Sequence, residues 1–153
     1  MEINNSLYAL PASYIVATLP HIFSAYTLNK ASGGKFTNVH PRTNLENLKD
    51  KVSHDVYTKA VRAEAAHKNN LEGFPLFATA LLAGNFAGVE ASLLNKFAAF
   101  YVGGRVLYNA LYTYTTREAT SQARSVLWLG LTSSCLYVLV KAAQGVAAVK
   151  RLY

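Results

Sequence analysis

The amino-acid sequence predicts an all-α integral membrane protein, a four-helix bundle in which all four helices are transmembrane. Hydrophobic residues make up 52% of the 153-residue chain and charged residues only 15%, against about 25% charged residues in an average soluble domain. The 15 basic and 8 acidic side chains are also unevenly placed, since 13 of them fall between residues 30 and 72. The remainder contains four stretches almost without charge, each close to the roughly 20 residues that cross a bilayer as a helix. We expect one domain over residues 1–153.

The first predicted span covers residues 7–28, within a charge-free run of 27 residues from Ile3 to Asn29. A cleaved signal peptide is the alternative, but the run is longer than the usual apolar region of such a peptide and no basic segment precedes it. We therefore expect a retained helix. Residues 29–55 are rich in Gly, Asn, Lys and Thr, which is typical of an irregular loop, here on the cytosolic side.

The other spans are predicted at residues 70–89, 93–114 and 125–147. The second is expected to begin earlier, near Asp55, as a polar helix. The third contains Lys96 and Arg105. A soluble helical bundle is the alternative, but stretches such as SVLWLGLTSSCLYVLV lack the polar face that a soluble helix shows on the 3.6-residue period.

The distribution of Lys and Arg predicts the orientation of the helices, because positive residues favour the cytosolic side. The two loops assigned to that side carry seven, namely Lys30, Lys35, Arg42, Lys49, Lys51, Arg117 and Arg124. The opposite side has Lys150 and Arg151, with Lys96 near a helix end. Both termini are therefore expected in the lumen. The net charge of +7 then follows from topology, and no nucleic-acid partner is expected.

The cysteine and histidine content suggests no metal centre. The single cysteine, Cys135, falls inside the fourth predicted span, where it is most simply a small packing residue. The four histidines, His21, His40, His54 and His67, look scattered and have no H-x-x-x-H spacing. We expect no bound metal.

Polar residues inside the spans suggest a binding site, because an ionisable group at bilayer depth costs a few kcal/mol. Arg62, Asn69 and Glu72 fall on one helix face at the cytosolic mouth of the second span. Arg105, Tyr108 and Tyr112 share a face of the third span, and Arg124 and Ser125 begin the fourth. The charge of Arg105 is expected to meet either Glu72 or a bound anion.

These side chains suit a small zwitterionic ligand with net negative charge. Arginine pairs with carboxylates, Asn69 can donate to and accept from a peptide bond, and Glu72 can hold an ammonium group. The apolar surroundings would admit a second, lipophilic reactant from the membrane lipids. This combination suggests conjugation chemistry.

At these residues the chain resembles the MAPEG family, the membrane-associated proteins of eicosanoid and glutathione metabolism. It is most similar to the type-3 microsomal glutathione transferases. The resemblance runs from about Ala65 to Ala143 and is strongest in two segments. AHKNNLEGFPLF at 66–77 is similar to the family's A-H-x-N-x-x-E-x-x-P-x-F signature, and VGGRVLYNALY at 102–112 to its G-R-V-L-Y-x-x-x-Y segment.

The resemblance implies a homotrimer in the endoplasmic reticulum or nuclear envelope, with glutathione bound as co-substrate between subunits. By motif position, Asn69, Glu72, Arg105, Tyr108 and Tyr112 would bind glutathione. Arg124 and Ser125 are similar to the family's basic and hydroxyl pair near the thiol, and Tyr112 is a further donor to sulfur.

One position departs from the family pattern. Family members carry an arginine four residues before the signature asparagine, where this chain has Ala65. Arg62, one turn earlier, or Lys68, next to Asn69, could supply the missing cation to glutathione.

The predicted function is a membrane-bound glutathione transferase or peroxidase that activates the thiol for attack on a lipophilic electrophile or lipid hydroperoxide. The alternative is a non-catalytic or repurposed member that keeps the fold as a scaffold or serves a specialised biosynthetic pathway. A transporter or channel is disfavoured, since the sequence has no internal repeat and no pair of interrupted helices.

Overall fold

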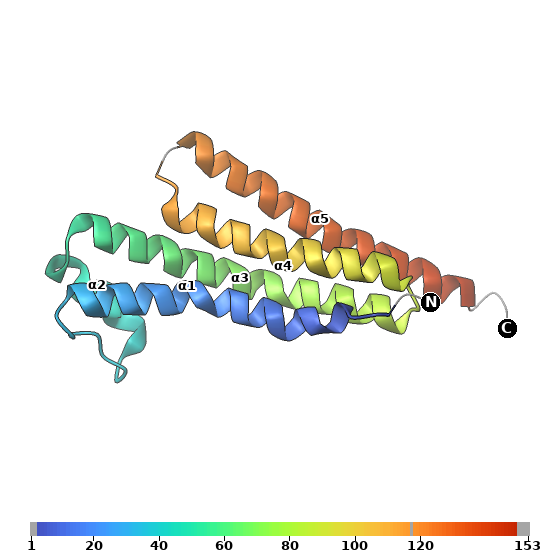
Figure 1. The fold of residues 1–153 in the computed structure, drawn as a ribbon, viewed down its shortest axis with the longest axis horizontal. Helices are drawn as coiled ribbons and strands as arrows, with labels where there is room; N and C mark the ends of the chain where they lie inside the picture. The colour runs from blue at the N-terminus through green and yellow to red at the C-terminus, as the bar shows by residue number, and fades with distance from the viewer. Residues whose placement is uncertain (1–2, 117, 150–153) are drawn as a thin grey trace.

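The computed structural model of the chain describes residues 3–116 and 118–149. Most of these residues form four long helices, α1 (Ala9–Ala31), α3 (His54–Phe86), α4 (Ala91–Tyr114) and α5 (Glu118–Val149), and the described part of the chain contains no strand. In Figure 1 the helices run along the long axis, and the first described residues lie at the same end as the end of α5. The predicted all-α fold class is confirmed.

The longest helix, α3, changes character along its length. It begins at His54 and carries most of its charged residues in its first half, whereas the second half is apolar. It ends at Phe86, three residues before the end of the second predicted span. Gly88 follows with φ of 69°, a left-handed conformation that only glycine adopts without strain. This turn reverses the chain into α4.

The main core lies between α3, α4 and α5, where small residues let the helices approach closely. The rings of Phe77 and Tyr101 stack with centroids 3.9 Å apart and planes within 4°. A Cβ placed on Gly84 of α3 would lie 2.7 Å from Leu94 of α4. Such close backbone approach is common among packed apolar helices, in which small residues allow dispersion contacts.

Pro20, inside α1, leaves a helical carbonyl without its usual partner. Proline has no N–H to donate to the residue four positions earlier, which is Val16. The side-chain Nδ2 of Asn109 in α4 donates to the Val16 carbonyl at 2.9 Å. Asn70 of α3 in turn donates from its Nδ2 to Asn109 Oδ1 at 2.5 Å. The two amides therefore link α1, α3 and α4.

Replacing Asn109 with alanine is expected to destabilise the protein by about 1–3 kcal/mol, because Val16 O and the buried Asn70 amide lose a partner. Thermal unfolding in detergent measures this change. Asn47→Ala is the control, since Asn47 is exposed and bonds only locally to Thr43 Oγ1. Equal unfolding midpoints for the two variants would contradict a structural role of the amide pair.

The loop between α1 and α3 is more ordered than the sequence suggested. It contains the short helical segments η2 (Pro41–Thr43), α2 (Asn44–Leu48) and η3 (Lys49–Lys51), while another, η1 (Ser6–Tyr8), precedes α1. Leu48 is buried against Leu28 and Ala60 in a second small core. The side chain of Asn44 accepts from the Thr37 backbone N–H at 3.0 Å and donates to the Thr37 carbonyl at 2.8 Å. The prediction of an irregular segment was wrong here because apolar residues spaced within a polar sequence close a core of their own.

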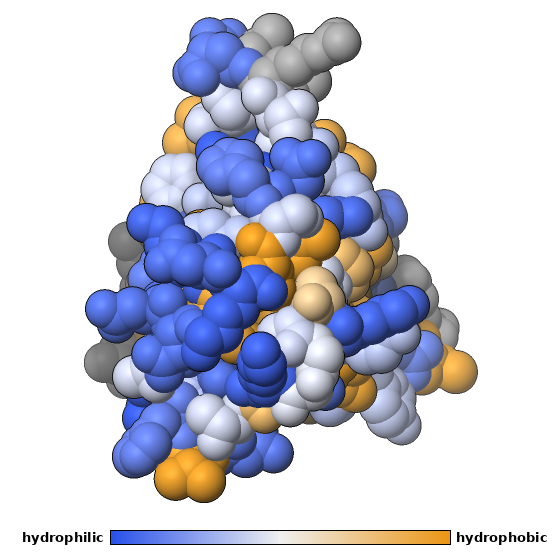
Figure 2. All heavy atoms as spheres, turned by 90° about the vertical axis from the view of Figure 1, so that its left-hand side faces the viewer, coloured by the Kyte–Doolittle hydropathy of each residue, from blue (hydrophilic) through white to orange (hydrophobic). Residues whose placement is uncertain are grey.

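Hydropathy separates α5 from the other helices. Within the described residues, one helical segment, Ser121–Ala147, is long and apolar enough to cross a membrane by length and composition. Polar side chains interrupt the apolar runs of α1, α3 and α4, and α1 and α3 also contain proline. Of the four predicted spans, this criterion supports the fourth alone. Figure 2 views the molecule from the loop end, where hydrophilic side chains cover most of the surface.

Candidate functional site

Arg105, in the middle of α4, is a cation in the interior of the bundle. It is only 3% exposed. Its Nη1 donates to Asn69 Oδ1 of α3 at 3.0 Å, and the rings of Tyr101 and Tyr108 lie 5.1 and 5.5 Å from its guanidinium carbon. Among the described residues no carboxylate pairs with it, and its Nε–H has no hydrogen-bond partner. A buried cation without a counter-charge is costly, so this position suits an anionic ligand.

Of the two expected partners of Arg105, Glu72 does not pair with it in the structure. Glu72 is exposed on α3, one turn beyond Asn69, and forms no ion pair with Arg105 within the described part of the chain. A bound anion remains the predicted partner.

Arg105 fits beside α3 because residue 73 has no side chain. A Cβ on Gly73 would overlap Nη2 of Arg105. The hydroxyl of Tyr101 donates to the Gly73 carbonyl at 3.1 Å, which fixes the ring below the guanidinium. Packing Arg105 of α4 against α3 therefore requires a glycine at residue 73, within the AHKNNLEGFPLF segment.

Gly73→Ala is expected to displace the guanidinium and to weaken binding of an anionic ligand about 10- to 100-fold, the loss of one charged hydrogen bond. Gly103→Ala in α4 is the matched control, because a Cβ there meets no atom within 4 Å. That control should bind normally and gain up to about 1 kcal/mol of stability from helix propensity. Isothermal calorimetry with glutathione, the ligand expected from the family resemblance, and thermal unfolding measure the two effects. Equal ligand affinity in both variants would contradict this role of Gly73.

A cavity of about 250 Å³ lies between α3, α4 and the first turns of α5 and is lined by Asn69, the residue that accepts from Arg105. In Figure 1, α5 diverges from α4 toward this end. The cavity is lined by Asn69, Tyr108, Tyr112, Arg124, Ser125 and Trp128. The guanidinium carbon of Arg124 lies 3.9 Å above the Tyr112 ring, and the Tyr108 and Tyr112 rings are 5.5 Å apart. Five residues predicted from three separate segments therefore share one cavity.

The other four predicted site residues do not line this cavity: Arg105 and Glu72 are described above, and Arg62 and Lys68 lie elsewhere. Arg62 donates from Nε to the Thr113 carbonyl at 3.1 Å, so its positive charge sits at the C-terminal end of α4, where helix carbonyls favour a cation. Lys68 lines a different pocket, between α1 and α3. Neither residue lines the cavity that contains Asn69, so within one chain neither places a cation in this cavity.

A cluster that the sequence analysis missed lies at the α1–α3 interface. His21, Glu64 and His67 each place one potential ligand atom so that all three atoms lie within 4.8 Å of one another. The expectation of scattered histidines was wrong for these two. Glu64 and His67 are three residues apart on one helix face, a spacing that could have signalled the pair; the contribution of His21 could not be seen from spacing. Of the predicted loop and terminal cations, Arg117, Lys150 and Arg151 lie outside the described residues.

Comparisons with known proteins identify the family. No curated protein and no solved structure matches the chain. The MAPEG family profile matches residues 8–144, a range that includes Arg105, the cavity lined by Asn69 and all four long helices except the C-terminal end of α5. The chain therefore belongs to the MAPEG family.

Proposed function

We propose that this protein is a membrane-bound glutathione transferase, with glutathione peroxidase activity from the same site. The observation that carries the proposal is the buried guanidinium of Arg105, which has no carboxylate partner among the described residues. A carboxylate of glutathione supplies the missing charge and can accept two parallel hydrogen bonds from the guanidinium. Asn69 accepts from Arg105 and keeps its NH₂ group free to donate to the peptide.

Glu72 and the tyrosines complete the binding set in this proposal. Glu72 is exposed on the same helix face as Asn69, one turn away, and can bind the ammonium of glutathione. The Tyr108 and Tyr112 rings line the cavity and supply apolar surface with hydroxyl donors at their tips. This arrangement distinguishes a zwitterionic peptide from a simple anion.

Arg124 and Ser125 are proposed to activate the thiol. A free thiol with a pKa of about 8.5 is only a few per cent ionised at neutral pH, and an adjacent cation shifts it toward the thiolate. Arg124 is held over Tyr112, and Ser125 lines the same cavity. The thiolate attacks an electrophilic carbon, forming a C–S bond while an epoxide C–O bond breaks and its oxygen takes a proton.

The peroxidase reaction uses the same thiolate. Attack on a lipid hydroperoxide breaks the O–O bond and releases the lipid alcohol after protonation. The oxidised glutathione sulfur then reacts with a second glutathione to give the disulfide and water. Both reactions require a lipophilic partner that enters from the membrane lipids.

The site is proposed to be completed by a neighbouring subunit in a homotrimer. The cavity of about 250 Å³ is smaller than the roughly 300–1,000 Å³ of pockets that enclose a ligand. Apolar side chains also point outward from two helices, among them Ile15, Leu19 and Ile22 of α1 and Leu129, Leu136 and Val140 of α5. These faces can contact lipid or another subunit.

We assign all four long helices to the membrane of the endoplasmic reticulum or nuclear envelope, with both termini in the lumen. The hydrophilic loop end in Figure 2 and the basic residues of that loop support a cytosolic position for it. Site-directed labelling tests the orientation. The cysteine introduced by Lys35→Cys should react with a membrane-impermeant reagent from the cytosolic side of intact microsomes. Reaction from the lumenal side alone would reverse the assignment.

One observation favours a second candidate, a non-catalytic scaffold. Ala65 replaces the family arginine, and neither Arg62 nor Lys68 lines the cavity. Calorimetry of the purified protein in detergent separates the two functions, because the scaffold predicts no saturable binding of glutathione. The enzyme predicts binding, a thiolate absorbance that depends on the protein, and turnover of epoxides, activated alkenes or hydroperoxides. Absence of saturable binding and of turnover across this panel would leave the scaffold.

A further inference from the structure

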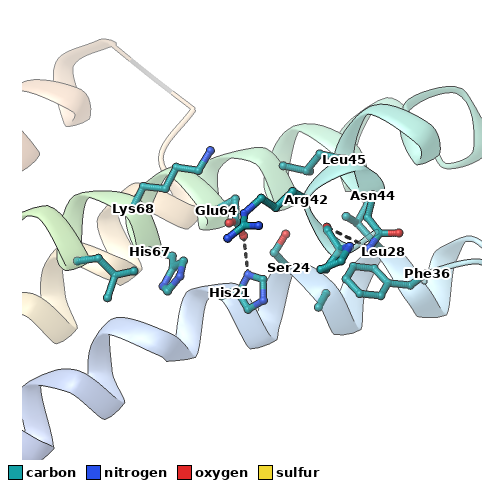
Figure 3. A pocket seen from close by; sticks show the side chains of 13 residues that line it. His21, Ser24, Leu28, Phe36, Arg42, Asn44, Leu45, Glu64, His67 and Lys68 are labelled. Carbon is teal, nitrogen blue, oxygen red and sulfur yellow. Dashed lines mark hydrogen bonds and ion pairs between the residues drawn. The ribbon is translucent and has the colours of Figure 1, made fainter. Parts of the chain in front are cut away.

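We propose that the α1–α3 interface holds a transition-metal ion of the zinc class on His21, Glu64 and His67. The site is separate from the cavity assigned to glutathione, and its residues lie on the other face of α3. Figure 3 shows the three side chains turned toward one another across the two helices. Each offers one ligand atom, and these atoms lie within 4.8 Å of one another.

The backbone brings two ligands from α3 and one from α1. Glu64 and His67 are neighbours on one face of α3, since residues three apart lie about one turn from each other. His21 meets them from α1, with its Nδ1 2.9 Å from Glu64 Oε2. The two imidazole rings have centroids 5.1 Å apart. A metal ion bound between these side chains would replace the hydrogen bond between His21 and Glu64.

An outer hydrogen bond orients one of the ligands. His67 Nδ1 lies 2.7 Å from the Ala17 carbonyl oxygen. A carbonyl can only accept, so Nδ1 carries a proton, and in the neutral imidazole Nε2 then has a free lone pair. Metal-binding histidines almost always donate their other ring N–H in this way, to a carboxylate or a backbone carbonyl. This bond is an observation independent of the clustering.

The donor set indicates the class of ion. Two imidazole nitrogens and one carboxylate oxygen suit Zn²⁺, or Co²⁺ in its place, with a fourth position open. Bonds of roughly 2.0–2.2 Å require the three side chains to close in slightly, which the half-exposed His21 can do. The ion would tie α1 to α3 beside the folded loop.

The surrounding pocket of about 510 Å³ also contains Arg42 and Lys68. One carboxylate does not neutralise a divalent ion, and these two cations add further positive charge. The open coordination position therefore favours an anion such as hydroxide or chloride. The same charges make a test possible, because they oppose a metal ion and attract a simple anion.

Binding is tested on the full-length protein in detergent, freed of metal by a chelator and titrated with Co²⁺, whose visible bands report nitrogen and oxygen ligands. We expect one ion per chain in the wild type. His67→Gln and Glu64→Gln should each weaken binding at least about 100-fold, more than the loss of an outer partner alone. His40→Gln and His54→Gln are matched controls and should bind as the wild type does. Zn²⁺ should raise the unfolding temperature of the wild type but not of Glu64→Gln.

Removing a cation near the proposed site is not expected to weaken Co²⁺ binding, in contrast to removing a ligand. Arg42→Gln should leave Co²⁺ binding unchanged or tighten it. Absence of saturable Co²⁺ binding, or equal weakening by the control histidine variants, would overturn the proposal. So would a titration in which inorganic phosphate, and not Co²⁺, binds the pocket and Arg42→Gln weakens it. These measurements need no glutathione, so their outcome is independent of the proposed transferase function.

Discussion

Arg105→Met is expected to abolish measurable glutathione binding and, at the same time, to stabilise the protein in the absence of glutathione. Truncating one partner of a buried charge pair costs about 2–5 kcal/mol of binding, or roughly 30- to several thousand-fold in Kd. Without the ligand, Arg105 is a buried cation that donates one side-chain hydrogen bond, to the neutral Asn69. Replacing buried charge by a well-packed apolar side chain is often stabilising, by about 1–4 kcal/mol.

The opposite signs of the two effects make this experiment informative. Calorimetry measures glutathione affinity, and thermal unfolding with and without glutathione measures stability. Lys96→Met is the control, because Lys96 is an exposed cation on the same helix and its replacement should change neither quantity much. A purely structural arginine would give the reverse pattern for Arg105→Met, with lower stability of the ligand-free protein and unchanged affinity.

Arg124→Gln is expected to lower kcat about 10²- to 10³-fold while changing glutathione affinity little. Losing one preorganised electrostatic donor typically has an effect of this size on the chemical step. The proposed cause is a smaller thiolate fraction, since the cation beside the sulfur is removed. Ultraviolet absorbance of the bound thiolate, titrated with pH, should show its ionisation moving to higher pH in the variant.

Lys141→Gln is the matched control for Arg124. Both cations lie on α5 over a tyrosine ring, Lys141 at 5.7 Å from Tyr137 and Arg124 at 3.9 Å from Tyr112. Only Arg124 lines the cavity beside Asn69. Lys141→Gln should keep full activity and an unchanged thiolate titration. An equal loss of kcat in both variants would show that Arg124 acts through general stability of α5 and not at the thiol.

The residues that line the cavity show which parts of the site the local sequence pattern can predict. Tyr108 and Tyr112 are four residues apart, and helix geometry alone places them on one face. Asn69 and Arg105 belong to different helices, and their polar character in apolar surroundings was the signal that joined them. Their 3.0 Å hydrogen bond was not predictable, because it depends on Gly73 leaving space between the helices.

Two predicted residues lie outside this cavity for a common reason. The helical period places Arg62 on the same stripe as Asn69, yet its long side chain reaches the end of α4 at Thr113. Lys68 is adjacent to Asn69 in sequence and therefore about 100° away around the helix, facing the pocket between α1 and α3. A helical wheel gives direction relative to one axis only. Which neighbour occupies that direction depends on how the helices pack.

The sequence by itself determined the helical fold class, the approximate helix positions and the polar residue types within them, because charge spacing and the 3.6-residue period are local properties. Tertiary structure decided the buried, unpaired state of Arg105, the cavity that joins three helices, and the meeting of His21 with Glu64 and His67. His21 and Glu64 are 43 residues apart in the chain. Their contact is set by the close packing of α1 on α3, which depends on the shapes of all the side chains between the helices.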